Sequence, residues 1–124
     1  MIGQFLILLA VHWVADFVLQ THWQASNKSK NLEALLRHIG VYTIVLVFTV
    51  PFIFPGDLET HSARWFAFVA GNGLLHFSTD FLTSRMTSRL YAKGDWHNFF
   101  VVMGLDQLIH QVTLAGTMLL IFGA

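Results

Sequence analysis

The chain has 124 residues, of which 55% are hydrophobic and 11% are charged, and its formal net charge is zero. Globular domains typically carry about 25% charged residues, so this composition favours a chain surrounded by lipid. The balanced charge gives no sign of a nucleic-acid partner, and the absence of cysteine excludes disulfides and thiolate metal sites. We therefore expect a single transmembrane domain over residues 1–124, with membrane lipids as its immediate partners.

Four apolar segments follow one another along the chain, and each is near the length that a helix needs to span a bilayer. They predict helices at about residues 2–22, 32–54, 61–89 and 98–123. The first segment has no basic leader and no small-residue cleavage pattern, so we expect it to be retained rather than removed as a signal peptide.

The short connections between these helices differ in charge. The middle connection has Arg64 as its only basic residue, alongside Asp57 and Glu59. The other basic residues lie in or beside the first and third connections: Lys28, Lys30, Arg37, Arg85, Arg89 and Lys93. Because basic residues in short loops mark the cytoplasmic side, the sequence predicts an all-α integral membrane four-helix bundle with both termini outside and the first and third loops in the cytoplasm.

Three of the predicted helices carry a histidine and an aspartate four residues apart, which places both side chains on one helix face. The pairs are His12 with Asp16, His76 with Asp80, and Asp106 with His110. The two helices that descend to the cytoplasm have the histidine first, whereas the ascending fourth helix has the aspartate first. At a rise of about 1.5 Å per residue, this reversal predicts one deep layer of histidines and one shallower layer of aspartates. His38, near the cytoplasmic start of the second helix, would join the shallower layer.

Buried aspartates repel one another and are costly to desolvate, so this set requires neutralisation. The aspartates could be protonated, they could pair with Arg37 and Arg85, or they could bind cations. Imidazole and carboxylate together suit Zn²⁺, Mn²⁺ and Fe²⁺, and the facing helices of a bundle can hold one or two such ions. We predict a divalent metal site that opens toward the cytoplasm, with zinc as the leading candidate. A metal-free proton relay and an ion-pair network with the arginines remain as alternatives.

Other polar residues have two possible roles. Gln20, Asn72, Gln107 and Gln111 could contact a substrate or the metal ligands, or they could be polar contacts between helices. The basic loop residues, Lys28 among them, are explained most simply as topology signals, although at the mouth of the site they could bind a lipid phosphate.

Three motifs carry a resemblance to a known family. They are His12-Trp-Val-Ala-Asp16-Phe-Val-Leu-Gln20, His76-Phe-Ser-Thr-Asp80 and Asp106-Gln-Leu-Ile-His110. Over nearly the whole chain the sequence resembles a family of small bacterial and phage membrane proteins described only as a domain of unknown function. The resemblance implies a multi-pass protein of the bacterial inner (cytoplasmic) membrane and no particular activity. More distantly, the pattern resembles membrane-bound metal-dependent hydrolases.

The leading hypothesis is a metal-dependent hydrolase that acts on a lipid or lipid-linked substrate at the cytoplasmic leaflet. His12, His76 and His110 would hold the metal with one or more of Asp16, Asp80, Asp106 and His38. A water bound to the metal would be the nucleophile, and whichever of the three aspartates stays free of the metal would be the general base.

The main alternative is not an enzyme but a cation or proton conduit, or a metal-sensing membrane subunit, built on the same His/Asp core. A conduit needs polar residues that continue to the outer face, and the outer halves of the first and fourth helices are nearly apolar. Haem held by two histidines ranks last because it leaves the aspartates unexplained. The sequence leaves a homo-oligomer open.

Overall fold

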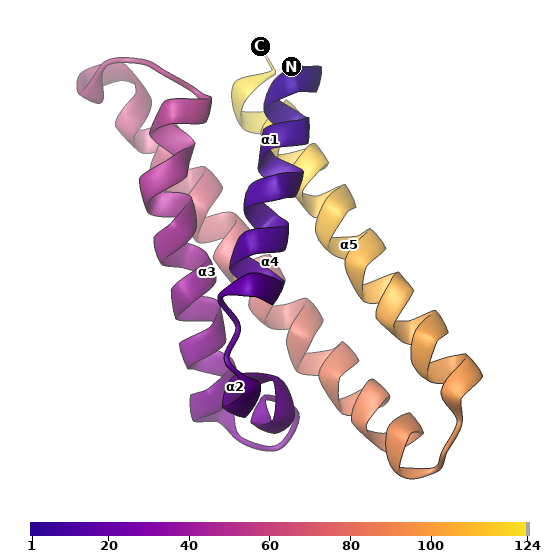
Figure 1. Cartoon of the computed structure of the whole chain (residues 1–124). Coiled ribbons are helices and arrows are strands. Elements are labelled where there is room, and N and C mark those ends of the chain that lie inside the picture. The colour runs from indigo at the N-terminus through magenta and orange to yellow at the C-terminus, as the bar shows by residue number, and fades with distance from the viewer. Residues whose placement is uncertain (124) are drawn as a thin grey trace.

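The computed structural model describes residues 1–123, and the elements within this range are helices (Figure 1). In chain order they are α1 (Ile2–Trp13), the π-helical segment η1 (Val14–Val18), α2 (His22–Asn27), α3 (Leu32–Ile53), α4 (Leu58–Ala92) and α5 (Trp96–Phe122). The all-α prediction is therefore confirmed for the described residues. The number of helices is not, because five α-helices stand where four were predicted.

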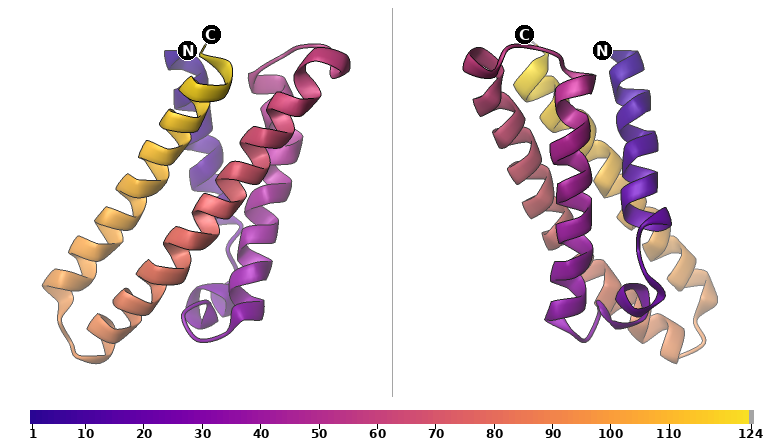
Figure 2. Two further views of the ribbon diagram at one scale, coloured as in Figure 1. Left: turned by 180° about the vertical axis from the view of Figure 1, so that it is seen from behind. Right: turned by 60° about the vertical axis from the view of Figure 1, so that its left-hand side comes forward.

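The long helices run between two ends of the molecule (Figure 2). The amino terminus, the end of α5 and the turn between α3 and α4 lie at one end, and α2 and the turn between α4 and α5 lie at the other (Figure 1). We call these the terminal end and the α2 end. Consequently the first and third connections, which carry most of the basic residues, share the α2 end.

The extra helix results from an early end to the first apolar segment. That segment was predicted to continue to residue 22, but the helix stops after Val18 and α2 begins after Thr21. The Thr21 hydroxyl accepts a hydrogen bond from the Gln24 amide at 3.1 Å, and the Gln24 side chain accepts one from the Thr21 amide at 3.0 Å. This reciprocal capping box starts a new helix.

Side-chain caps also fix the starts of α3, α4 and α5. Asn31 caps α3, Asp57 caps α4 and Asp95 caps α5. The backbone and side chain of Thr60 donate hydrogen bonds to Asp57 at 2.8 Å, and these bonds lower the pKa of Asp57. Hydrogen bonds from the Asn98 side chain and backbone lower the pKa of Asp95 in the same way.

The interior is divided along the helix axes. An apolar cluster fills the half toward the terminal end, where Leu8, Leu46, Phe68 and Leu114 have 1% or less of their surface exposed. Next to this cluster the Asn72 amide of α4 donates a hydrogen bond to the Thr117 hydroxyl of α5 at 2.9 Å. Toward the α2 end the buried side chains become polar.

Large apolar side chains cover much of the outside. Phe48 and Phe52 of α3 are 69% and 85% exposed, and Leu120 of α5 is 83% exposed. Among the described residues, α3 and α5 are the two helices that are long and apolar enough to cross a membrane. The first apolar helix, Ile2–Val18, is shorter, and α4 does not meet the same criterion.

Candidate metal centre

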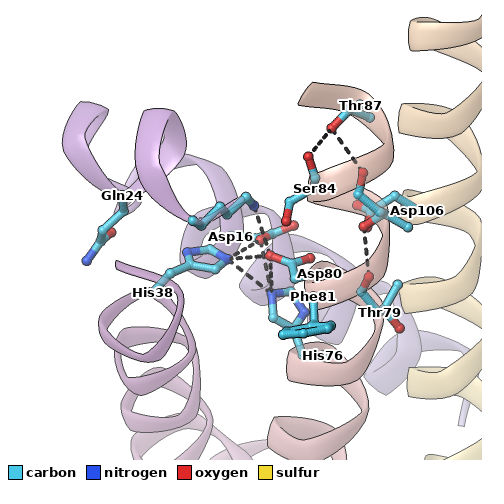
Figure 3. A network of polar contacts seen from close by, with 12 residues as sticks. Asp16, Gln24, His38, His76, Thr79, Asp80, Phe81, Ser84, Thr87 and Asp106 are labelled. Atoms are coloured by element: carbon cyan, nitrogen blue, oxygen red, sulfur yellow. Dashed lines mark hydrogen bonds and ion pairs between the residues drawn. The ribbon is translucent and has the colours of Figure 1, made fainter. Parts of the chain in front are cut away.

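The seven side chains that the sequence singled out lie in one group between the apolar cluster and the α2 end. Six of them are buried and Asp106 is partly exposed. Figure 3 shows how those from α3, α4 and the π-helical segment point toward one another. The members of the group, which we call the His/Asp cluster, are His12, Asp16, His38, His76, Asp80, Asp106 and His110.

The π-helical segment positions Asp16 in this cluster. The Leu19 amide bonds to the Val14 carbonyl oxygen at 2.9 Å, a bond that spans five residues rather than four. Such wide turns are rare and occur frequently at functional sites. The Asp16 side chain is 4% exposed, and its carboxylate contacts side chains from α1, α3, α4 and α5.

Four side chains form the tightest group, and each offers one ligand atom within 4.8 Å of the others. His38 Nε2 lies 2.9 Å from Asp16 Oδ1 and 3.3 Å from Asp80 Oδ2. His76 Nε2 lies 3.2 Å from the same Asp16 oxygen and 3.8 Å from the same Asp80 oxygen. Two nitrogen ligands about 2.0–2.1 Å from a tetrahedral zinc ion are roughly 3.3 Å apart, and the two Nε2 atoms here are 3.2 Å apart. The spacing therefore suits a single small cation at the centre of the group.

The orientation of the two imidazoles decides which nitrogen faces the group. The polar contacts of His38 and His76 pass through Nε2, and the Nδ1 atoms of both rings have no hydrogen-bond partner within residues 1–123. The Tyr42 ring stacks on His76 with a centroid distance of 4.1 Å and an angle of 8°. This stacking holds the His76 ring so that Nε2 points at the carboxylates.

A second group shares Asp80 with the first. Asp80, Asp106 and His110 also offer ligand atoms within 4.8 Å of one another. His110 Nε2 lies 3.1 Å from Asp80 Oδ1 and 3.4 Å from Asp106 Oδ1. Since His38 and His76 face the other oxygen of Asp80, the two oxygens of this carboxylate serve different groups. The Thr83 hydroxyl donates to Asp106 Oδ1 at 2.6 Å and fixes that carboxylate.

His12 lies beside both groups and belongs to neither. Its Nε2 is 3.5 Å from Asp16 Oδ2, and its ring centroid is 5.3 Å from that of His110. Neither ring nitrogen has a hydrogen-bond partner among the described residues. The sequence predicted a deep layer of His12, His76 and His110; the three rings do lie together, but the groups with ligand spacing use His38 in place of His12.

The positive charge next to the cluster comes from Lys28, which sequence reasoning assigned to the loop. Its ammonium lies 2.8 Å from Asp80 Oδ2. Arg37 instead pairs with Glu33 at 2.7 Å, and Arg85 donates to the Phe81 carbonyl oxygen. Helical spacing could not reveal the role of Lys28, because this residue follows α2 and reaches the cluster only through the fold of the first connection.

The chain matches a known protein family over nearly its whole length. A family described as protein of unknown function (DUF3307) covers residues 4–123. The chain belongs to this family. The match includes the entire His/Asp cluster, and it agrees with the resemblance to a domain of unknown function. No curated protein and no solved structure matches the chain.

A cavity of about 540 Å³ lies next to the cluster of this DUF3307 chain. Asp16, Asp106 and Gln107 line it on the cluster side, and Lys28 lines it from the first connection. The remaining wall comes from η1, α2, the last third of α4 and the first part of α5. The cluster therefore adjoins a space large enough for part of a small molecule, at the α2 end of the fold.

Proposed function

We propose that this protein is a metal-dependent hydrolase of the bacterial inner membrane, which acts on a lipid or lipid-linked substrate at the cytoplasmic leaflet. One observation supports this proposal above the others. Ligand atoms of Asp16, His38, His76 and Asp80, from three separate parts of the chain, lie within 4.8 Å of one another and are buried.

Hydrogen bonding alone accounts poorly for the centre of this group. Asp16 Oδ1, His38 Nε2 and His76 Nε2 form a triangle with sides of 2.9, 3.2 and 3.2 Å. A neutral imidazole has one N–H, which points in a single direction. Two such rings can make two of the three contacts as hydrogen bonds, whereas a cation between the three atoms is attracted by all of them at once. The triangle therefore favours a bound ion.

The charges of the cluster favour a divalent ion as well. Three carboxylates lie in or beside a buried space, and one ammonium, that of Lys28, is paired with them. A divalent cation in the first group would neutralise the remainder, and a second in the Asp80–Asp106–His110 group would leave a net positive centre. Imidazole and carboxylate ligands suit Zn²⁺ first, with Mn²⁺ and Fe²⁺ as other candidates.

Hydrolysis requires an activated water and a group that accepts its proton. A bound divalent ion lowers the pKa of a water ligand and polarises an ester oxygen. If the second group holds no ion, Asp106 is the best candidate for the general base among the three aspartates. Its side chain is 15% exposed, it lines the cavity, and Thr83 and Gln107 orient its two oxygens. Asp16 and Asp80 are in the first group and are better suited to hold the metal.

The membrane location is supported by the outward-facing apolar side chains of α3 and α5. In the proposed topology the first apolar helix and α4 also cross the bilayer, where exposed Phe66, Leu74 and Leu82 of α4 would face lipid. The α2 end, with its basic connections, would lie in the cytoplasm and both termini outside. The cavity would then open at the level of the cytoplasmic leaflet.

A cation or proton conduit is the second candidate, and the same interior argues against it. The apolar cluster around Leu46, Phe68 and Leu114 fills the half toward the terminal end. A conduit needs polar or hydrated contacts across its full length. A site that is closed at one end fits a pocket better than a pore. A metal-sensing subunit would bind the metal at the same site but would not catalyse hydrolysis.

Elemental analysis of the purified full-length protein tests the metal. We expect one or two equivalents of zinc, manganese or iron, lost in His76→Ala and in Asp80→Ala while the helical circular dichroism persists. His97→Ala, which changes an exposed histidine, is the matched control. A native protein without metal, even after incubation with each ion, would refute the hydrolase. A metal-loaded protein that releases no product from phospholipid ester or phosphodiester substrates would favour the sensor.

A further inference from the structure

Two polar atoms in the wall of the cavity have no hydrogen-bond partner in the part of the chain that the structure describes. The Ser84 hydroxyl of α4 and the side-chain amide oxygen of Gln20 (Oε1) are buried, and neither forms a hydrogen bond within residues 1–123. Both residues line the cavity beside the His/Asp cluster, and the Ser84 residue is 8% exposed. Ser84 and Asp16, both drawn in Figure 3, line the same cavity. Buried polar atoms in proteins are nearly always satisfied, so this wall is built for a polar ligand.

The hydrogen-bonding properties of these two atoms limit the kinds of ligand that could bind here. An amide carbonyl oxygen only accepts hydrogen bonds, whereas a serine hydroxyl both donates and accepts. A bare phosphate or carboxylate could accept a hydrogen bond from Ser84, but it has no hydrogen to donate to the Gln20 side-chain oxygen in the orientation that this amide adopts here. A ligand that carries free hydroxyl groups satisfies both. Further hydroxyls of Thr87 and Ser88 line the same cavity.

Lys28 favours a ligand that carries negative charge. Its ammonium has three N–H donors, and one is directed to Asp80. The residue lines the cavity, so the ligand lies within reach of the other donors. Two divalent ions in the neighbouring groups would make the centre positive. An anionic ester, such as a phosphate, therefore fits beside Lys28 and the metal centre.

One part of the wall is apolar and reaches the outside of the protein. Phe17 of η1 and Met103 of α5 line the cavity and are 45% and 38% exposed. Phe99 of α5 also lines the cavity. A ligand with hydrocarbon chains could leave the cavity along this side while its polar part remained within.

We propose that the cavity binds the headgroup of a phospholipid that carries free hydroxyls, with the phosphate beside Lys28 and the hydroxyls at Ser84 and Gln20. The acyl chains leave past Phe17 and Met103. This inference rests on the proposed function for the metal that lies beside the phosphate, and it names the class of substrate.

Binding of defined lipids to the metal-loaded protein in neutral detergent tests the proposal. The probes are phosphatidylglycerol, phosphatidylcholine (the same phosphate without hydroxyls), diacylglycerol (a hydroxyl without phosphate) and free glycerol 3-phosphate. We expect phosphatidylglycerol to bind about tenfold more tightly than phosphatidylcholine, as one or two additional hydrogen bonds would give. It should also bind more tightly than diacylglycerol, which lacks the phosphate, and than glycerol 3-phosphate, which lacks the acyl chains. Equal affinity for phosphatidylglycerol and phosphatidylcholine would overturn the proposal. If free glycerol 3-phosphate bound as tightly as phosphatidylglycerol, the proposal that the ligand is a lipid would be overturned.

Variants assign the preference to named atoms. Ser84→Ala and Gln20→Leu are expected to remove the preference for phosphatidylglycerol over phosphatidylcholine. The matched controls are Ser78→Ala on the exposed face of α4 and Gln111→Leu on the exposed face of α5. Retention of the preference in Ser84→Ala and Gln20→Leu would overturn the headgroup site.

Elemental analysis of the same samples separates this inference from the proposed function. If the protein binds no metal but still prefers phosphatidylglycerol in a way that depends on Ser84, the hydrolase is wrong and the headgroup site stands. If metal is present and the lipid preference is absent, the headgroup site is wrong and the metal centre stands.

Discussion

His38 of α3 and His76 of α4 present their Nε2 atoms to each other at 3.2 Å, and both atoms lie within 3.2 Å of the same oxygen of Asp16. The three groups come from three different elements, so their approach results from the packing of the whole bundle. Packing two imidazoles and a carboxylate so closely is costly unless something with positive charge lies between them.

The shared carboxylate of Asp80 predicts an unequal response to substitution. Because Asp80 belongs to both groups, we expect Asp80→Asn to remove all bound metal, whereas Asp106→Asn removes only an ion in the second group. If the protein holds a single ion, Asp106→Asn leaves the stoichiometry unchanged. Elemental analysis gives the equivalents for each variant, with exposed Glu59→Gln as the control. Loss of all metal in Asp106→Asn with retention in Asp80→Asn would contradict the assignment.

The position of Lys28 predicts that its substitution increases the affinity for metal. Its ammonium lies 2.8 Å from an oxygen of the first group and repels a cation there. Lys28→Met therefore increases the affinity for divalent ions, by about tenfold or more given charges a few ångströms apart in a partly buried site. Competition with a chelating dye measures this, and Lys30→Met, which changes an exposed lysine, is the control. Weaker binding in Lys28→Met would mean that Lys28 orients Asp80 rather than opposing the ion.

Two glycines of α4 predict opposite effects on stability. A Cβ atom at Gly73 would lie 3.0 Å from the Thr43 hydroxyl of α3, which is held by a hydrogen bond to the Ile39 carbonyl oxygen. At Gly71 a Cβ atom meets nothing within 4 Å. We expect Gly73→Ala to destabilise the protein by about 1–3 kcal/mol through this clash, and Gly71→Ala to be neutral or to stabilise it by up to about 1 kcal/mol.

Thermal unfolding in detergent compares the two variants. Adding Thr43→Ala to Gly73→Ala removes the clash and is expected to restore much of the lost stability. If Gly73→Ala were as stable as Gly71→Ala, the close approach of α3 and α4 at this position would be refuted.

The cap of α4 predicts a dependence of stability on pH. The hydrogen bonds from Thr60 lower the pKa of Asp57 in the folded protein, so the ionised carboxylate stabilises the fold above the ordinary pKa of an aspartate. This contribution is lost as the pH falls through the lower, folded-state value. The difference in melting temperature between the native protein and Asp57→Asn is therefore expected to shrink between about pH 6 and about pH 2. A difference that does not change with pH would contradict the ionised cap.

Much of the cluster could be predicted from the sequence because helical geometry relates spacing to position. The four-residue spacing of His76 and Asp80, and its reversal in Asp106 and His110, place these side chains on facing sides of antiparallel helices. The structure brings them together as expected. The start of α3 after Asn31 could also be predicted from the sequence, because an asparagine before an apolar run is a typical helix N-cap.

Other features depend on contacts that spacing does not encode. The π-helical turn before Leu19 lies in a mostly apolar segment, so hydropathy predicted that the first helix would continue to residue 22. The separate helix α2 falls almost entirely in what was predicted to be a connection. Lys28 reaches Asp80 across 52 residues of sequence, and nothing in its immediate neighbours distinguishes it from Lys30. His12 has the same spacing as the other pairs, and only the packing of the rings shows that His38 takes its place.

In the membrane location proposed above, the early end of the first helix would also affect the surrounding lipids. With the 12 residues of α1 and the five of η1, this helix is about 25 Å long, whereas α4 with its 35 residues is about 50 Å long. The hydrocarbon core of a bilayer is about 30 Å thick, and a helix that is too short draws the lipid surface toward it. In a membrane, the leaflet beside Val18 would therefore be locally thin. Headgroups at that point would lie deeper than elsewhere, at the level of the cavity wall formed by Phe17 and Met103.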